Sequence, residues 1–177
     1  MAHEIEKATF AGGCFWGVEH LFNEMPGVIE AVSGYAGGTR EEPTYQQVCT
    51  GRTGHAEAVE VTYDPTKVTY EALLAAFWNM HDPTTLNRQG PDVGHQYRSS
   101  IFFHTPEQEM IARRSKEEAQ KHFNRPIVTE IVAAPKFWRA EEYHQRYFEK
   151  HPGHYSCHFY RGWVPGQPET AEGAKQA

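Results

Sequence analysis

Residues 6 to 104 contain six segments whose hydrophobic periods follow the order strand, helix, strand, strand, helix, strand. Four of them alternate apolar and polar residues or form short apolar runs, which is typical of strands: residues 6–12, 28–35, 55–63 and 97–104. Two repeat apolar residues every three or four positions, which is typical of amphipathic helices: residues 14–25 and 70–81. This order restricts the chain to folds in which helices connect the strands of one sheet.

We therefore predict an α+β fold, a two-layer sandwich with a ferredoxin-like (split βαβ) core. Thr105-Pro106-Glu107-Gln108 forms a capping box that predicts a further helix to about His122. A strand is expected over residues 128–132 and a last helix over 137–150, whereas the stretches around residues 38–54 and 84–94 are expected to be loops. The prediction is one domain over residues 1–177, with a flexible segment from about residue 151.

The composition excludes several classes of function. Hydrophobic residues make up 39% of the 177 residues, enough for a core of the chain's own. The net charge is −6 and no Lys/Arg cluster occurs, which argues against nucleic-acid partners. No apolar run approaches the ~20 residues of a membrane helix, and residues 1–7 lack the apolar part of a signal peptide. We expect a cytoplasmic monomer with no membrane partner.

The sequence has three cysteines, Cys14, Cys49 and Cys157. This number is small and odd, which argues against a disulfide scaffold. Cys14 follows Gly12-Gly13 at the predicted start of a helix, where free backbone N–H groups and the helix dipole stabilise an anion. This position lowers the pKa of a thiol and favours the nucleophilic thiolate. The alternative is a buried cysteine that acts as a small hydrophobic residue.

Glu57 lies in the predicted strand over residues 55–63, on the same face as three apolar residues, Val59, Val61 and Tyr63. An apolar environment raises the pKa of a carboxyl group, so that it can act as a general acid near neutral pH. The alternative is a glutamate at the end of a strand that reaches water. Tyr45 and Tyr97 are candidate hydroxyl donors or packing residues. Asp92 could orient donors or shape an Asx turn.

Phe15 and Trp16 follow Cys14 directly. They are either core aromatics or the walls of an apolar pocket for a small group such as a methyl. Four metal-ligating side chains also lie close together near the C-terminus: His151, His154, Cys157 and His158. They lack the paired spacing of structural zinc sites, so no metal site is predicted.

Several segments resemble the signature of the class A peptide methionine sulfoxide reductases, in the family's order over about residues 8 to 163. They are Gly13-Cys14-Phe15-Trp16-Gly17, Gly54-His55-Ala56-Glu57-Ala58-Val59, Gln96-Tyr97-Arg98-Ser99, Tyr143-His144-Gln145 and Tyr155-Ser156-Cys157-His158-Phe159. Members of this family repair oxidised methionine. The resemblance implies reduction of the S epimer of methionine sulfoxide, free or in proteins.

The resemblance also implies a role for each candidate residue. Cys14 is the nucleophile and becomes a sulfenic acid, and Cys157, in the C-terminal segment, resolves it as a disulfide that thioredoxin or another dithiol reduces. Glu57 protonates the sulfoxide oxygen. The remaining implied roles are oxygen binding by Tyr45 and Tyr97, support by Asp92, and a methyl cage of Phe15 and Trp16. Cys49 receives no role, and neither a cofactor nor a metal is implied.

Two rival functions of other classes are compatible with parts of the sequence. A thiol hydrolase would use Cys14 with a histidine base and would need no second cysteine. A histidine-rich metal-binding module would use the histidines between His151 and His158. Assays with methionine sulfoxide, with thioesters and for bound metal would separate the three functions.

Overall fold

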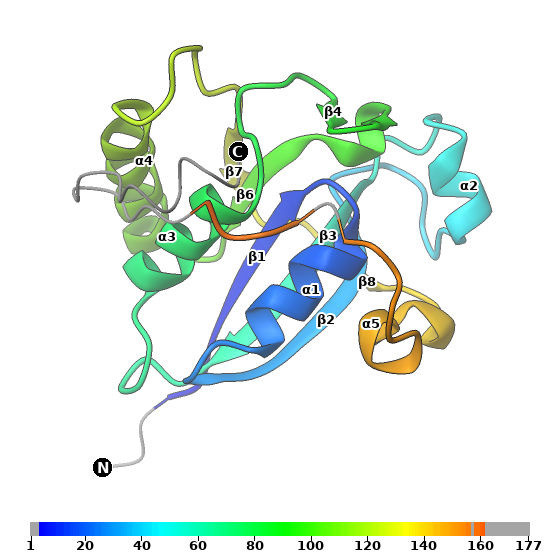
Figure 1. Cartoon of the computed structure of the whole chain (residues 1–177), viewed down its shortest axis with the longest axis horizontal. Helices are drawn as coiled ribbons and strands as arrows, with labels where there is room; N and C mark the ends of the chain where they lie inside the picture. The colour runs from blue at the N-terminus through cyan, green and yellow to red at the C-terminus, as the bar shows by residue number, and fades with distance from the viewer. Residues whose placement is uncertain (1–3, 157, 162–177) are drawn as a thin grey trace.

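A six-stranded sheet in the order β7-β6-β1-β3-β2-β8 organises the computed structural model, which describes residues 4–156 and 158–161 (Figure 1). The strands of this sheet are β1 (Glu6–Gly12), β2 (Val28–Ala36), β3 (Ala56–Tyr63), β6 (Ser99–Phe103), β7 (Glu130–Ala133) and β8 (Trp138–Arg139). The helices are α1 (Phe15–Asn23), α2 (Tyr45–Cys49), α3 (Tyr70–Met80), α4 (Pro106–Gln120) and α5 (Tyr147–Lys150). The fold is thus a mixed α/β fold with a central sheet.

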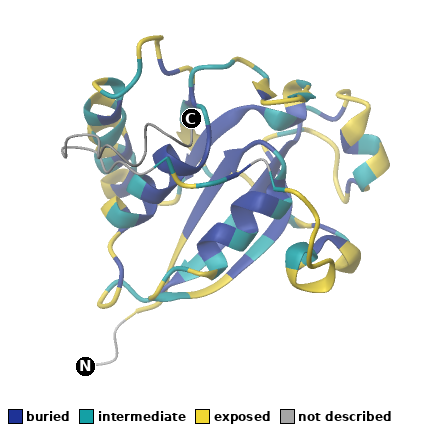
Figure 2. Cartoon of the chain, viewed as in Figure 1, coloured by how far each residue is buried: buried dark blue, intermediate teal, exposed yellow. Residues whose placement is uncertain are grey.

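The four strands β6-β1-β3-β2 are antiparallel to their neighbours, and β7 joins β6 as a parallel edge strand. Helix α1 connects β1 to β2, and α3 lies between β3 and β6 in the sequence. Both helices lie on the side of the sheet that faces the viewer in Figure 1. Their inward faces and the strands behind them are buried (Figure 2).

Aromatic side chains fill the space between the sheet and these helices. Phe10 of β1 is fully buried, and its ring lies 5.1 Å from the rings of Phe22 on α1 and Phe77 on α3. Because one strand residue contacts both helices, the core fixes where α1 begins relative to the sheet. A smaller cluster lies elsewhere in the sheet and is made of Ala11, Ala36, Ala56, Ala58 and Phe102.

Local capping explains where most helices begin. The side chains of Thr44, Thr69 and Thr105 accept hydrogen bonds from the backbone N–H groups that open α2, α3 and α4. At α4 the capping box is only half formed, because the Gln108 side chain accepts the N–H of His104 and not that of Thr105. Helix α2 itself was not predicted, although Thr44 and Gln47 form a complete capping box in a stretch expected to be loop.

The prediction of a helix over residues 137–150 is wrong. The segment contains β8, a 3-10 turn η2 (Glu142–His144) and the four-residue α5. Trp138 pairs with Tyr35 at the sheet edge, and the Gln145 side chain bonds both the N–H and the C=O of Ser33. These long-range hydrogen bonds to β2 outweigh the local helical period, and a left-handed Arg146 (φ 52°) interrupts the chain before α5.

Smaller differences occur near residue 90. The expected loop over residues 84–94 contains a two-stranded hairpin of β4 (Arg88–Gln89) and β5 (Asp92–Val93). Residues 95–97 form a 3-10 turn, η1 (His95–Tyr97), so the strand expected from residue 97 begins at Ser99.

Beyond residue 157, Tyr160 and Arg161 donate hydrogen bonds to backbone carbonyls of α1 and α3, Leu21 and Asn79. The chain therefore returns across these two helices (Figure 1).

Candidate active site

Cys14 occupies the N-cap position of α1, directly before the first helical residue, and is half-buried. The glycines around it allow other segments to pack closely. A Cβ atom at Gly17 would lie 2.3 Å from His158 Nδ1, and one at Gly13, whose φ is +95°, would lie 2.7 Å from the Gln89 side chain. Neither position can hold a larger residue unless these neighbours move. The sequence-predicted helix start at Cys14 is therefore confirmed to within one residue.

Glu57 lies on β3 with its carboxyl group buried beneath the start of α1. Its side chain is 2% exposed, and the residues that share its face, Val59, Val61 and Tyr63, are fully buried. The backbone N–H of Phe15 donates a hydrogen bond to Oε1 at 3.2 Å. Within the described residues, Oε2 is buried without a hydrogen-bond partner. Burial raises the pKa of Glu57 to about 8, so the carboxyl group is largely protonated at neutral pH.

Tyr45, Tyr97 and Asp92 reach the same region from three separate elements: α2, η1 and β5. Burial raises the pKa of each tyrosine, and the charge of Glu57 raises both further. The pKa of Tyr97 is also raised by Asp92, Cys49 and Cys14, which shows that these groups lie within electrostatic range of its hydroxyl. Asp92 in turn contributes to the raised pKa of Glu57. The structure therefore brings Cys14, Glu57, Tyr45, Tyr97 and Asp92 together.

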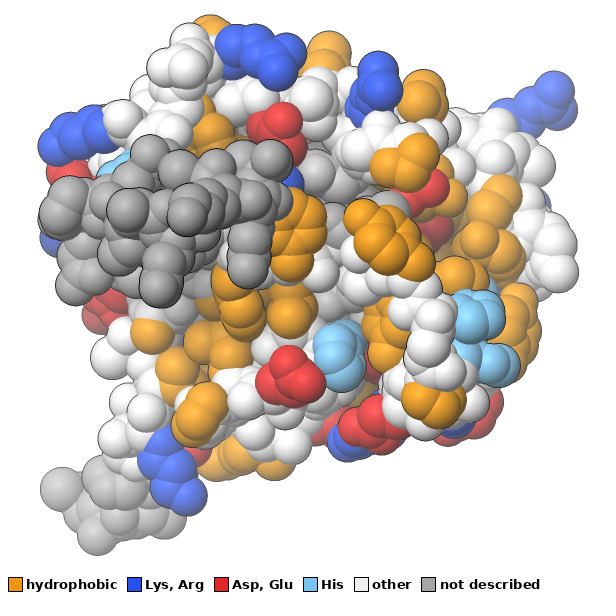
Figure 3. All heavy atoms as spheres, in the orientation of Figure 1, with side chains coloured by type: hydrophobic (Ala, Val, Ile, Leu, Met, Phe, Trp, Pro, Cys, Tyr) orange, Lys and Arg blue, Asp and Glu red, His pale blue; other side chains and the backbone are white. Residues whose placement is uncertain are grey.

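Phe15 and Trp16 form the start of an aromatic cluster beside this site. Phe15 is buried, and its ring lies 5.7 Å from Tyr35 and 6.5 Å from Tyr45. The Trp16 indole stacks on Tyr147 of α5, with 3.7 Å between ring centroids and 3° between planes. On the face that carries α1 and α5, hydrophobic and histidine side chains lie next to one another (Figure 3).

Two residues that sequence reasoning did not select hold the aromatic cluster in place. The Trp16 indole N–H donates to His144 Nδ1 at 2.9 Å, and His144 is 1% exposed. Glu141 accepts hydrogen bonds from the Tyr35 hydroxyl and the Tyr45 backbone N–H, at 2.9 and 3.0 Å. Burial alone would raise the pKa of Glu141, but these hydrogen bonds lower it overall. The signal in the sequence was polar residues on the apolar side of the helix predicted over 137–150.

The residue after Cys157 is anchored beside the site. His158 Nε2 donates to the backbone carbonyl of Gly12 at 2.7 Å, and the His158 ring is buried against Gly17. Burial lowers the pKa of His158 to about 4. Cys157 itself lies outside the described residues. Cys49, at the last position of α2, is exposed; burial raises the pKa of its thiol, and the Tyr45 side chain opposes this shift.

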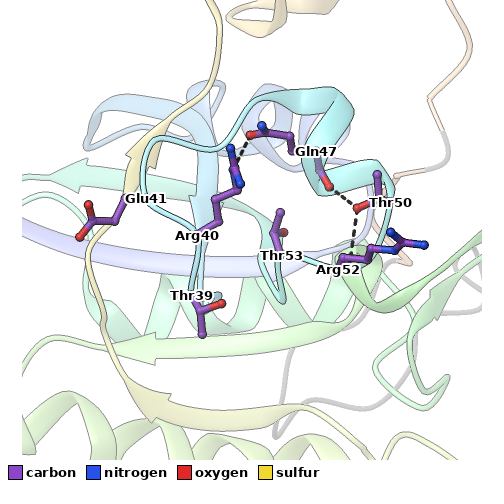
Figure 4. A pocket seen from close by; sticks show the side chains of 7 residues that line it. All are labelled: Thr39, Arg40, Glu41, Gln47, Thr50, Arg52 and Thr53. Atoms are coloured by element: carbon purple, nitrogen blue, oxygen red, sulfur yellow. Dashed lines mark hydrogen bonds between the residues drawn. The ribbon is translucent and has the colours of Figure 1, made fainter.

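A polar groove of about 590 Å³ lies on the other side of α2 (Figure 4). It is lined by Thr39, Arg40, Glu41, Gln47, Thr50, Arg52 and Thr53. Arg40 donates to the Gln47 side chain, and Thr50 links Gln47 to Arg52. None of the sequence-predicted site residues lines this groove, and its side chains hold one another by hydrogen bonds. We therefore place the candidate active site at Cys14.

Metal ligands and membrane spans were also sought in the structure. Across residues 4–156 and 158–161, no three His, Cys, Asp or Glu side chains converge as a metal site would require. Of the histidines near the C-terminus, His154 bonds the Tyr147 hydroxyl and His158 bonds Gly12. None of the helices in the described part of the chain has the length and apolar character needed to span a membrane.

Comparison with known proteins identifies the family. The family model described as peptide methionine sulfoxide reductase matches residues 6–169. The peptide methionine sulfoxide reductase MsrA of Methanoculleus marisnigri is 65% identical over 151 residues, which cover 84% of this chain and 92% of the relative.

Solved structures agree with this match. Reduced Mxr1 from Saccharomyces cerevisiae has a TM-score of 0.84 at 38% identity and covers 89% of this chain and 92% of its own. Mxr1 in complex with Trx2 matches with a TM-score of 0.61 at 26% identity and covers 90% and 94% of the two chains. The chain therefore belongs to the peptide methionine sulfoxide reductase family of oxidoreductases.

Proposed function

We propose that this enzyme reduces the S epimer of methionine sulfoxide, free and in proteins, by transfer of the sulfoxide oxygen to Cys14. The thiolate of Cys14 attacks the sulfoxide sulfur while the oxygen takes up a proton. The hydroxyl group then passes to the Cys14 sulfur as its bonds to the methionine sulfur break, which gives methionine and a Cys14 sulfenic acid. The observation that carries the proposal is the position of Glu57. One carboxyl oxygen is bonded to the residue after Cys14, and the other is buried and has no partner within the described residues.

Glu57 is proposed to act as the general acid. An unprotonated oxide is a poor leaving group, so attack on sulfur requires a proton on the oxygen. A carboxyl group with a pKa of about 8 carries that proton at neutral pH and has an unoccupied oxygen from which to deliver it. The N-terminus of α1 favours the thiolate of Cys14 over the thiol.

Tyr45 and Tyr97 are proposed to donate hydrogen bonds to the same oxygen. Their raised pKa values keep both hydroxyls protonated and therefore able to donate. Asp92 supports this network, because its charge acts on both Tyr97 and Glu57. Phe15 and Trp16 receive the methyl group, since the two aromatics follow the nucleophile directly and belong to one cluster.

Recycling is proposed to use Cys157. Its thiol condenses with the Cys14 sulfenic acid to give a disulfide and water, and a dithiol such as thioredoxin reduces the disulfide. Two observations support this step. His158, the next residue, donates a hydrogen bond to the backbone carbonyl of Gly12, two positions before Cys14. A relative of similar fold, Mxr1, has been solved in complex with Trx2.

The architecture is proposed to be a single catalytic domain with a split βαβ core and a C-terminal segment, from about residue 151, that carries the resolving cysteine. Support for the core comes from the order β6-β1-β3-β2, its antiparallel pairing, and the helices α1 and α3 that connect its strands.

The test is product analysis with the two separated epimers of a blocked methionine sulfoxide and dithiothreitol as reductant. The S epimer should yield methionine and the R epimer should not, because methyl pocket, oxygen donors and nucleophile fix three positions around a chiral sulfur. Equal turnover of both epimers would refute the pocket. Hydrolysis of thioesters without sulfoxide reduction would favour a thiol hydrolase, although His158, with a pKa of about 4, is a weak base for that reaction.

A further inference from the structure

Glu19 is a buried carboxylate that the proposed chemistry does not use. It lies on α1, one turn after Trp16, and is 1% exposed. Burying a carboxylate is unfavourable unless hydrogen bonds compensate for the lost water. Burial raises the pKa of Glu19 to about 7. A residue with this cost requires a specific explanation.

Its hydrogen bonds lead to the turn before α5. Both Glu19 oxygens accept the backbone N–H of Arg146, at 3.1 and 2.9 Å. The Arg146 guanidinium instead contacts Glu149 on the surface. Glu19 therefore holds the backbone at position 146 and not the charged side chain.

The backbone at position 146 is one that needs such support. Arg146 has a φ of 52°, in the left-handed region that is unfavourable for a residue other than glycine. The next residue, Tyr147, opens α5 and stacks on the Trp16 indole at 3.7 Å. Two positions before Arg146, His144 accepts the indole N–H. The turn that Glu19 holds is thus flanked by both residues that fix the plane of Trp16.

We propose that Glu19 is a positioning residue that sets the size of the S-alkyl pocket, because its bonds to the Arg146 N–H keep Tyr147 stacked against Trp16. The inference rests on the proposed function, in which Trp16 is a wall of the methyl pocket. When Glu19 no longer accepts the Arg146 N–H, the Trp16 indole should be held less firmly. The pocket should then accept alkyl groups larger than methyl.

The experiment compares methionine sulfoxide with ethionine sulfoxide, which carries one more methylene on sulfur. In a well-packed pocket one methylene changes kcat/KM by about 10-fold or more. The wild-type protein should prefer the methyl substrate by a factor of this order. Glu19→Ala should raise the KM for the methyl substrate, change kcat less, and remove most of the preference.

Two further substitutions of Glu19 separate its role from general stability. Glu19→Gln keeps an oxygen that can accept the Arg146 N–H and should retain the preference. Glu19→Asp keeps the carboxylate but moves its oxygens away from the Arg146 N–H, because the side chain is one methylene shorter. Its preference for the methyl substrate should lie between the preferences of wild type and Glu19→Ala. This variant also keeps the test valid if Glu19→Ala does not fold. Glu24→Gln changes an exposed carboxylate directly after α1; it is the matched control and should leave the preference unchanged.

The path through Tyr147 is tested by a double variant. Tyr147→Ala should reduce the preference by the same factor as Glu19→Ala, and the combined variant should show no further loss, since both act on one contact. Two results would overturn this inference and leave the proposed function standing. In the first, the double variant loses preference by the product of the two single factors. In the second, the Glu19→Ala protein loses thermal stability but keeps the full preference for the methyl substrate. A wild-type protein that reduces neither sulfoxide would overturn the proposed function, and this inference with it.

Discussion

The backbone N–H of Phe15 donates to Glu57 Oε1 across 3.2 Å and so ties the start of α1 to the middle of the sheet. Because Phe15 directly follows Cys14, any shift of β3 relative to α1 moves the proposed acid, Glu57, away from the proposed nucleophile, Cys14. This hydrogen bond joins two residues that are 42 positions apart in sequence, and it adds to the aromatic core around Phe10 that already places α1 on the sheet.

The first prediction concerns the pH dependence of the reductive step. With a pKa of about 8, Glu57 loses its proton as the pH rises through 8, so the single-turnover rate of methionine release should fall there. Glu57→Gln should be slower by roughly 10²–10⁴-fold and should lose this descending limb, because an amide cannot deliver the proton. Glu60→Gln, the matched control from the same strand, should keep the wild-type rate and the fall in rate above pH 8. A wild-type rate that stays level from pH 7 to 9 would contradict the assignment.

The second prediction concerns stability. The folded-state pKa of Glu57, about 8, lies above the ordinary value of 4.5, so the folded protein binds the proton more tightly than the unfolded chain. This contribution to stability is complete below pH 4.5 and is lost as the pH rises through 8. Relative to wild type, Glu57→Gln should therefore gain about 1.4 kcal/mol in free energy of unfolding per pH unit between pH 5 and 8. Urea unfolding at both pH values measures it, and a constant difference would argue against a raised pKa.

The third prediction concerns recycling. Cys157→Ser should release one methionine per chain and then stall with thioredoxin, while a small thiol partly restores turnover. Cys49→Ser is the matched control and should recycle nearly normally. Mass mapping after oxidation by substrate should find Cys14 linked to Cys157. A Cys14–Cys49 link together with an inert Cys157 would reverse the assignment.

The fourth prediction concerns the contact between Gly17 and His158. A Cβ atom at position 17 would lie 2.3 Å from His158 Nδ1, and overpacking of this kind costs about 1–3 kcal/mol. Gly17→Ala should lower the free energy of unfolding by this amount. In a His158→Ala background, the same substitution should cost little, because the clashing ring is gone. Equal losses in both backgrounds would show that helix α1 itself, and not the contact, requires glycine.

Local patterns predicted the sheet's main strands and the first two long helices well. Strands β1, β2 and β3 and helices α1 and α3 lie within two residues of the predicted ranges, because their apolar periods agree with their packing. The segment over 137–150 could not be predicted in this way. Its period is helical, yet its conformation is decided by hydrogen bonds to Ser33, Tyr45 and Trp16, which are distant in sequence.

The site residues also differ in whether a local pattern or a contact between distant residues determines them. Cys14 was predicted as a site residue from its glycines and its place at a helix start, and Glu57 from the apolar face of its strand. Glu141 and Glu19 were missed, and His144 was named only within the Tyr143-His144-Gln145 segment, without a role. Their partners are backbone groups and aromatic side chains that no sequence spacing brings together. The hydrogen bonds that hold the proposed site residues in place thus become visible only in three dimensions.

The bond between His158 and Gly12 also has a consequence for biosynthesis. The two residues are 146 positions apart, so on the ribosome Gly12 emerges long before the residue that hydrogen-bonds to its carbonyl group. Domains fold largely as the chain is synthesised, from the N-terminal end. In a nascent chain the Gly12 carbonyl and the Gly17 side of α1 consequently stay uncovered until His158 has left the exit tunnel and docks against them.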